Sequence, residues 1–178
     1  MISESWSWKR PLLQAADQFH ELKSAVELTD EQLSQLEREI FIGFYSVRKL
    51  FDAVAMITDA TKAMVINLEW HPNLEAVTWR NSHKISEAYD LSVSNYETRD
   101  VRFICGRIIH SFVFAHCVEA DGGFAGIFFA SDIDKDSKLY FLHTDKIIDI
   151  FQRVGNDDPV NIVWSKDQQT GKEKLVVG

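Results

Sequence analysis

Apolar residues recur every three or four positions through most of the first half of the chain, which is the period of amphipathic helices. The first such run follows Pro11, a residue suited to the start of a helix, and predicts a helix over residues 11–26. The next run follows a capping box, in which Thr29 and Gln32 satisfy backbone N–H groups at the helix start. Because this run keeps the helical period as far as Ile57, it predicts a long central helix that touches several partners.

A glycine interrupts the apolar stripe of this central helix. Gly43 lies on the inward face, where glycine costs about 1 kcal/mol relative to alanine. We therefore expect another element to approach the helix backbone closely at this position.

The middle of the chain carries weaker signals. Residues 60–81 are expected to form a connecting region with two short strands, and residues 82–93 a modest helix. Ser94 and Glu97 match a second capping box, which predicts a helix that ends near His110. The inward face of that helix would contain Val101, Ile104, Cys105, Ile108, Ile109 and Phe112.

After this helix the apolar period changes to two, which is typical of strands. Strands are predicted over 111–119 and 124–131, joined by a turn at 120–123, and the sequence LYFLH predicts a third strand after the turn DIDKDSK. Thr144 can cap a further helix that ends at Gly155. The sequences VNIVW and EKLVV, on either side of the turn DQQTGK, predict two final strands.

This order of elements predicts the fold class. Helices precede a mainly antiparallel sheet with one inserted helix, which is an α+β arrangement with a long central helix in an N-terminal helical bundle. The length of 178 residues suits a single domain over residues 1–178. Its helical part is expected over about 11–111 and its sheet part over about 112–178.

Composition and charge narrow the functional classes. The chain is 46% hydrophobic and 26% charged, as in globular proteins, and its net charge of −8 argues against non-specific coating of nucleic acid. Cys105 and Cys117 lie in apolar surroundings, which favours free thiols and a reducing cytoplasm. The sequence shows no signal peptide and no apolar run long enough for a membrane span, so no membrane association is expected.

The helix expected before His110 has a second stripe almost opposite its apolar face. This stripe contains Arg99, Phe103, Gly106 and His110. A glycine that permits close approach, an aromatic anchor and flanking cations are typical of a helix–helix contact or a ligand-binding face. A solvated face with one exposed aromatic residue is the plain alternative.

The segments FIGFYSVRKLFDA and GRIIHS, read together, resemble the HEPN-type helical domains of prokaryotes. The resemblance covers residues 30–111 and implies a bacterial-type domain that dimerises and, in many relatives, cleaves RNA. In the ribonucleases of that family an arginine precedes the histidine by four to six intervening residues. Here Phe103, Ile104 and Cys105 occupy those positions, and Arg102 and Arg107 lie outside the spacing.

Two readings of His110 follow. A cationic or donor side chain in the last turn stabilises exposed helix carbonyls by ~0.3–1 kcal/mol, so His110 is interpreted as a helix terminator or interface residue. In the alternative reading the chain is a HEPN-like endoribonuclease, with His110 as acid or base and Arg102, Arg107 or Arg99 as the phosphate partner.

Metal and cofactor sites are not expected. Asp132, Asp134 and Asp136 alternate as in the first half of a calcium loop, but Ser137 and His143 occupy the positions of its glycine and final glutamate, which favours a solvated turn. A zinc site is not expected either, because its candidate ligands would not converge. Those candidates are Cys105, His110, His116 and Cys117.

The predicted strands 111–119 and 124–131 are apolar on both faces. Helices can cover one face, and the inserted helix, the N-terminal helix or a second subunit must cover the other. Together these features predict a non-catalytic cytoplasmic protein that binds or regulates, forms a C2 homodimer and has a protein as a further candidate partner. RNA is a partner only in the ribonuclease reading.

Overall fold

A computed structural model describes residues 4–120, 122–166 and 170–178 of the chain. Its helices are α1 (Trp6–Leu22), α2 (Asp30–Asp52), α3 (Asp59–Lys62), α4 (Ile85–Ala88), α5 (Val101–Ile109) and α6 (Thr144–Gly155). Its strands are β1 (Val65–Pro72), β2 (Asn95–Asp100), β3 (Ser111–Val118), β4 (Phe124–Ser131), β5 (Lys138–His143), β6 (Ile162–Lys166) and β7 (Glu173–Val177). The α+β class is confirmed, with helices first and a mainly antiparallel sheet with an inserted helix after them.

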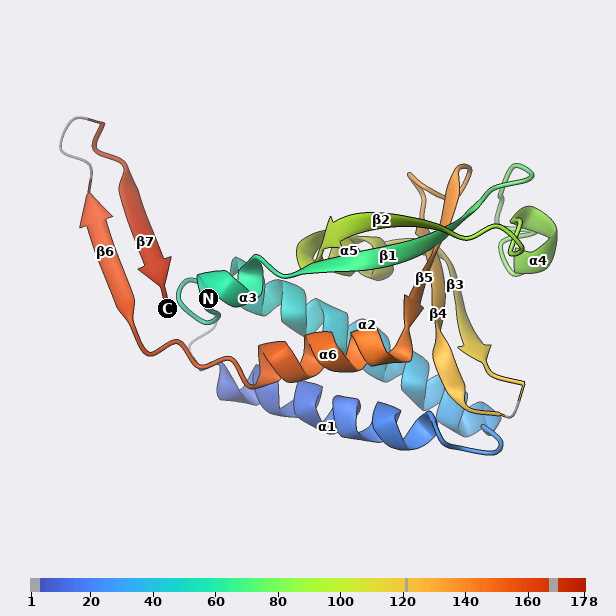
Figure 1. The fold of residues 1–178 in the computed structure, drawn as a ribbon, viewed down its shortest axis with the longest axis horizontal. Coiled ribbons are helices and arrows are strands. Elements are labelled where there is room, and N and C mark those ends of the chain that lie inside the picture. Colours follow the sequence, from blue (N-terminus) through green and yellow to red (C-terminus); the bar gives the residue numbers. More distant parts are fainter. Residues whose placement is uncertain (1–3, 121, 167–169) are drawn as a thin grey trace.

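Five strands form the main sheet in the order β2-β1-β5-β4-β3, with antiparallel pairing throughout. Among the described residues, the two remaining strands, β6 and β7, pair only with each other, in a separate antiparallel hairpin. Figure 1 shows this hairpin projecting away from the helices and the main sheet. We call residues 160–178 the arm.

Helices cover one face of the main sheet. Helix α1 packs along α6, and α2 packs against α5. A single apolar core joins side chains from these four helices to β1, β4 and β5, and its members include Phe19, Phe44, Ile108, Phe129 and Phe151. None of the helices in the described ranges has both the length and the apolar character that a bilayer crossing requires.

The close approach predicted at Gly43 is confirmed. A Cβ atom on Gly43 would lie 2.2 Å from Cζ of Phe151, whose ring occupies the space beside α2. Phe151 belongs to α6 and packs against Phe44 with ring centroids 5.2 Å apart and ring planes tilted by 60°. Glycine at this position therefore allows α6 to dock on the central helix.

The predicted ends of the first two helices need correction. Helix α1 begins at Trp6 rather than Pro11, because the carbonyl of Ser5 already accepts the N–H groups of Trp8 and of the next residue. The helix also stops at Leu22 rather than at residue 26. The capping box of α2 is confirmed, but α2 ends at Asp52 instead of continuing to residue 57.

The helix predicted to begin after Ser94 is wrong in its first half. Residues 95–100 form β2, whose side chains alternate in burial because the strand pairs along β1. The Ser94 hydroxyl bonds Glu69 instead of capping a helix, and Asp100 caps α5 by accepting the N–H of Phe103. Strand β1 lies within residues 60–81, where short strands are predicted, whereas β2 takes residues that the pattern assigns to a helix. Both strands fall within the 11–111 part that is expected to be helical.

The predictions for the second half agree closely with the structure. Strands β3, β4 and β5, helix α6 and the two strands of the arm all lie where the sequence places them. The predicted cap of α6 is wrong, because Thr144 is the first residue of the helix and its hydroxyl donates to the carbonyl of Phe124 at 2.7 Å. Residue 121 of the predicted 120–123 turn and residues 167–169 of the final turn lie outside the described residues. Between residues 82 and 93 the helix is only one turn long, and Ala88 and Tyr89 are buried.

The second face of the sheet is covered by the same chain, at least beside β3 and β4. The connection between β1 and β2 folds over it and forms a smaller apolar cluster of Val77, Ala88, Tyr89, Val113, Ala130 and Leu139. Phe124 packs in the core on the helix-covered face of the sheet, whereas Phe128 packs against the smaller cluster on the second face. Two residues four positions apart on one strand lie on opposite faces here because the β3–β4 ladder shifts register between Cys117 and Val118. A second subunit is therefore not required to cover these strands.

Candidate functional site

Phe103 lies between two arginines of its own chain. The guanidinium carbon of Arg99 lies 4.5 Å from the centroid of the Phe103 ring, and that of Arg107 lies 4.7 Å from it. The edge of the ring meets Tyr140, with centroids 5.7 Å apart. Although Arg99 is on β2 and not on the helix, the turn from β2 into α5 brings the arginine back over the ring.

Glu97 connects this aromatic cluster to the edge of the sheet. Its carboxylate accepts bonds from Nε of Arg99 at 2.8 Å, Nζ of Lys138 at 2.6 Å and Oη of Tyr140 at 3.1 Å. Burial alone raises the pKa of Glu97, but these three bonds outweigh burial and lower the pKa to about 2. Burial also raises the pKa of Tyr140, and the charges of Asp134 and Glu97 add to that effect. The cluster is thus a charged, internally paired surface.

Arg107 is held from the other side by the turn between β4 and β5. Its Nε atom lies 2.7 Å from Oδ2 of Asp134, but the N–H does not point at that oxygen, so the contact is an ion pair without a hydrogen bond. Ser131 donates its hydroxyl to the same carboxylate at 2.6 Å. Asp134 is buried, and it therefore fixes Arg107 over the Phe103 ring.

Arg102 points to the opposite side of α5, toward the end of α2. It pairs with the carboxylate of Asp52 and donates from Nη2 to the carbonyl of Phe51 at 3.1 Å. Arg48 pairs with the same carboxylate at 2.9 Å. Burial tends to raise the pKa of Asp52, but the bonds and charges of the two arginines lower it overall. Gly106 faces this group, since a Cβ atom there would lie 3.9 Å from Nη1 of Arg48.

His110 ends α5 and is exposed to solvent. Its backbone N–H donates to the carbonyl of Gly106 at 3.2 Å, as expected for a residue that closes a helix. The structure does not bring it together with Arg102 and Arg107, because those two arginines pair with carboxylates on different sides of the helix. Of the predicted stripe, Arg99 and Phe103 are in contact, whereas Gly106 faces Arg48.

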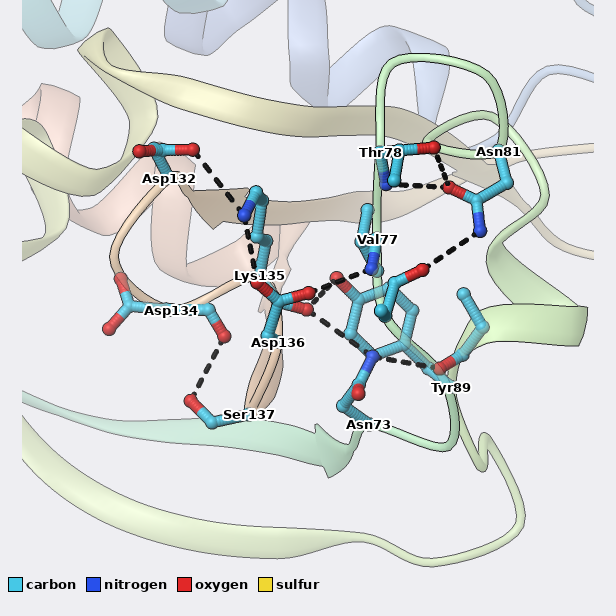
Figure 2. A network of polar contacts seen from close by, with 12 residues as sticks. Asn73, Val77, Thr78, Asn81, Tyr89, Asp132, Asp134, Lys135, Asp136 and Ser137 are labelled. Carbon is cyan, nitrogen blue, oxygen red and sulfur yellow. Dashed lines mark hydrogen bonds and ion pairs between the residues drawn. The ribbon is translucent and has the colours of Figure 1, made fainter.

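The aspartates of the β4–β5 turn have structural partners (Figure 2). Asp136 accepts the backbone N–H of Val77 at 2.7 Å, and Lys135 lies 2.8 Å from Asp136 and 3.5 Å from Asp132. Oη of Tyr89 donates to the carbonyl of Lys135 at 2.6 Å. These bonds tie the turn to the β1–β2 connection, so the turn holds that connection against the sheet.

No site for a metal ion is formed by His, Cys, Asp or Glu side chains within residues 4–120, 122–166 and 170–178. Cys105 is buried in the core, and burial raises the pKa of its thiol to about 12. Cys117 is a partly buried free thiol on β3, where burial also raises its pKa.

A surface groove is the feature that the sequence analysis missed. It has a volume of about 470 Å³ and is lined almost entirely by apolar atoms, from the side chains of Trp8, Phe41, Ile42, Tyr45, Ser46 and Ile109. Ile42 and Tyr45 are 49% and 45% exposed, so the groove opens to solvent. The sequence contains one indication of this groove, the aromatic residues Phe41 and Tyr45 beside the inward stripe of α2. The groove itself forms only in the fold, where Trp8 of α1 and Ile109 of α5 lie next to them.

We found no match to the chain among protein-family models, curated proteins or solved structures. The resemblance to HEPN-type domains therefore stays a prediction, and function has to be argued from the geometry of the described residues.

Proposed function

We propose that this chain is a non-catalytic binding protein that self-associates as a C2 homodimer. The groove between α1, α2 and the end of α5 is the observation that carries the proposal. Apolar area removed from water stabilises a complex by roughly 25 cal/mol per Å², and aromatic residues such as Trp8 and Tyr45 are enriched at protein interfaces. C2 homodimers are the commonest oligomers among soluble proteins.

The side chains that the ribonuclease reading needs have other partners. Arg102 is used to join α5 to α2, and Arg107 is used to join α5 to the β4–β5 turn. Both guanidinium groups are thus paired with carboxylates of the same chain. This arrangement favours a binding protein over a HEPN-like endoribonuclease.

Two further features of the proposal concern its setting. The free thiols of Cys105 and Cys117 support a reducing compartment, which we propose to be a bacterial-type cytoplasm. The Phe103 face stays a second candidate interface, although two arginines of the same chain already cover that ring.

Light scattering coupled to size exclusion tests the proposal on the full chain. We expect the wild type to elute with the mass of two chains and the Ile42→Glu variant with the mass of one, because a carboxylate cannot be buried unpaired in an apolar interface. Ser34→Glu is the matched control, since Ser34 is an exposed residue of the same helix, and it should keep the dimer. A Phe103→Glu variant that alone dissociates would move the interface to the arginine-flanked face, and a monomeric wild type would refute self-association.

RNA cleavage tests the alternative. Purified protein is incubated with structured and single-stranded RNA beside a His110→Ala variant. We expect both proteins to leave the RNA intact. Cleavage by the wild type that disappears in the variant would support the endoribonuclease instead.

A further inference from the structure

The arm is attached firmly to the body at its base. Val177 is buried, with 4% of its surface exposed, and its N–H donates to Oδ2 of Asp59 at 3.1 Å. Immediately before the arm, Asp157 accepts the N–H of Thr58 at 2.9 Å and its hydroxyl at 2.6 Å. Lys9 of α1 donates to the carbonyl of Asp157 at 2.5 Å. These bonds fix the direction in which the arm leaves the body. Figure 1 shows that direction.

Beyond this base the arm presents apolar side chains to solvent. The register pairs Ile162 with Val177 and Trp164 with Leu175, and side chains of paired residues lie on the same face of a hairpin. Ile162 and Trp164 are 52% and 59% exposed, and every residue of β6 is exposed. One face of the arm is therefore an apolar strip that extends outward from the buried Val177.

Such a hairpin needs a cover. A two-stranded hairpin is marginally stable by itself in water, and large apolar side chains gain roughly 1.5–3 kcal/mol each from burial. The strip also lies beside unpaired strand edges, which favour association with another chain. The arm is thus built to pack against a second molecule.

Charge favours a second copy of this chain as that molecule. The arm carries three of the 19 Lys and Arg residues and two of the 27 Asp and Glu residues, so it is slightly basic, whereas the remaining 159 residues keep 16 and 25, a net charge of −9. Contact between two bodies is therefore repulsive, and contact between an arm and a body is attractive. Glu37, one helical turn before Phe41 of the groove, is half exposed and offers a carboxylate to lysines of the arm.

The groove is the matching apolar surface on the body, and it lies near the base of the arm. Trp8 lines the groove, and the next residue, Lys9, binds the carbonyl of Asp157 at that base. A two-fold axis near this end of the molecule would bring each arm toward the groove of the other copy. Both contacts would then be identical, as a C2 interface requires.

We propose that the two copies exchange arms, so that the face formed by Ile162, Trp164 and Leu175 of one copy packs in the groove of the other. This inference rests on the proposed self-association and names the surfaces that produce it. Trp164 is the central anchor, because aromatic side chains at the centre of an interface contribute most of the binding free energy. Lys166 lies on the same face as Trp164 and can meet the acidic body of the second copy, whereas Lys174 pairs with Ser165 on the opposite face.

Substitutions on the two faces of the arm test the exchange by light scattering. Trp164→Glu should halve the mass, whereas the matched control Ser165→Glu, an exposed residue on the opposite face of the same strand, should keep the mass of the wild type. Trp164 is exposed in the single chain, so circular dichroism should show both variants folded. A dimeric Trp164→Glu protein would overturn the arm exchange and leave self-association standing, while a monomeric wild type would overturn both.

Disulfide trapping identifies the surface that the arm meets. In a Cys117→Ser background, a Leu175→Cys chain, which keeps Trp164, and an Ile42→Cys chain are mixed and oxidised. We expect the mixed disulfide dimer to predominate over either self-linked dimer, since arm and groove face each other across the interface. Self-linking of Leu175→Cys would instead indicate that two arms pack together, and an equal, low yield of all products would indicate that another molecule covers the arm; either result overturns the proposal.

Discussion

Strands β4 and β6 are similar in apolar character but opposite in environment. Both are rich in large apolar residues, yet Ile127 and Phe129 of β4 are completely buried, whereas Trp164 of β6 is 59% exposed. The difference arises from what lies beside each strand, since β4 is the fourth of five paired strands under a layer of helices and β6 has one neighbour. An apolar strand pattern therefore identifies the strand, and only the fold shows whether the same chain or another molecule covers it.

Truncation of one aromatic residue on each strand should separate the two environments most widely. Phe129→Ala should lower the free energy of unfolding by ~3–5 kcal/mol, because it leaves a cavity in a closed core. Trp164→Ala should lower stability only at concentrations where the wild type is dimeric, through loss of the second copy. Urea denaturation at several protein concentrations measures both, and a similar, concentration-independent loss in the two variants would contradict the comparison.

A pair of glycines tests how closely the covering helices pack. Gly43→Ala should cost ~1–3 kcal/mol, because the added methyl group would overlap the ring of Phe151. Gly106→Ala should instead stabilise the chain by up to about 1 kcal/mol, since alanine favours the helix and space is available beside Arg48. Thermal denaturation should show a lower melting temperature for Gly43→Ala and a higher one for Gly106→Ala than for the wild type. A Gly43→Ala protein as stable as the wild type would mean that α6 does not pack on α2 as described.

The polar edge of the main sheet should respond to acid. The pKa of Glu97 is lowered from 4.5 to about 2 in the folded chain, so its stabilising effect is complete above about pH 4.5 and is lost as the pH falls toward 2. The stability difference between wild type and Glu97→Gln should shrink over that window. Urea titrations of both proteins at several pH values measure this difference, and a difference that stays constant between pH 4.5 and 2 would contradict the account.

His116 should give the smallest effect. Burial lowers the pKa of this residue of β3 below 6.5, with a partial opposing effect from the charge of Glu37. The unfolded chain then binds the proton more readily, so stability should fall as the pH drops below about 6.5. His116→Gln should remove this slope and Cys117→Ser should keep it; an unchanged slope in His116→Gln would show that other groups cause it.

The sequence predicts much of the fold because several local signals agree with tertiary packing. The capping box at Thr29, the glycine at position 43 and the two-residue period of β3 and β4 all appear in the structure as expected. The helix predicted to start after Ser94 is wrong over its first six residues. These residues match a helix start, but their side chains also suit the alternating burial of a strand, and hydrogen bonding to β1 stabilises the strand. The local preference of a short segment for helix or strand is outweighed where a neighbouring strand is available for pairing.

The candidate site was less accessible to sequence reasoning. Arg99 and Phe103 are in contact as predicted, but they do not share a helix. Arg99 is on β2, and the two residues meet because β2 leads directly into α5. Nothing in the sequence indicates that Arg102 and Arg107 hold α5 on two sides, since their partners, Asp52 and Asp134, are distant in the chain. The groove is formed by three separate segments, and the exposure of the arm depends on the absence of neighbours, which no local pattern records.

Sedimentation equilibrium of the wild-type chain over a dilution series tests the central claim most directly. The exposed groove and the exposed arm strip predict a mass of two chains that decreases reversibly toward one on dilution. A single-chain mass at every concentration would contradict self-association and leave both apolar surfaces to a different molecule.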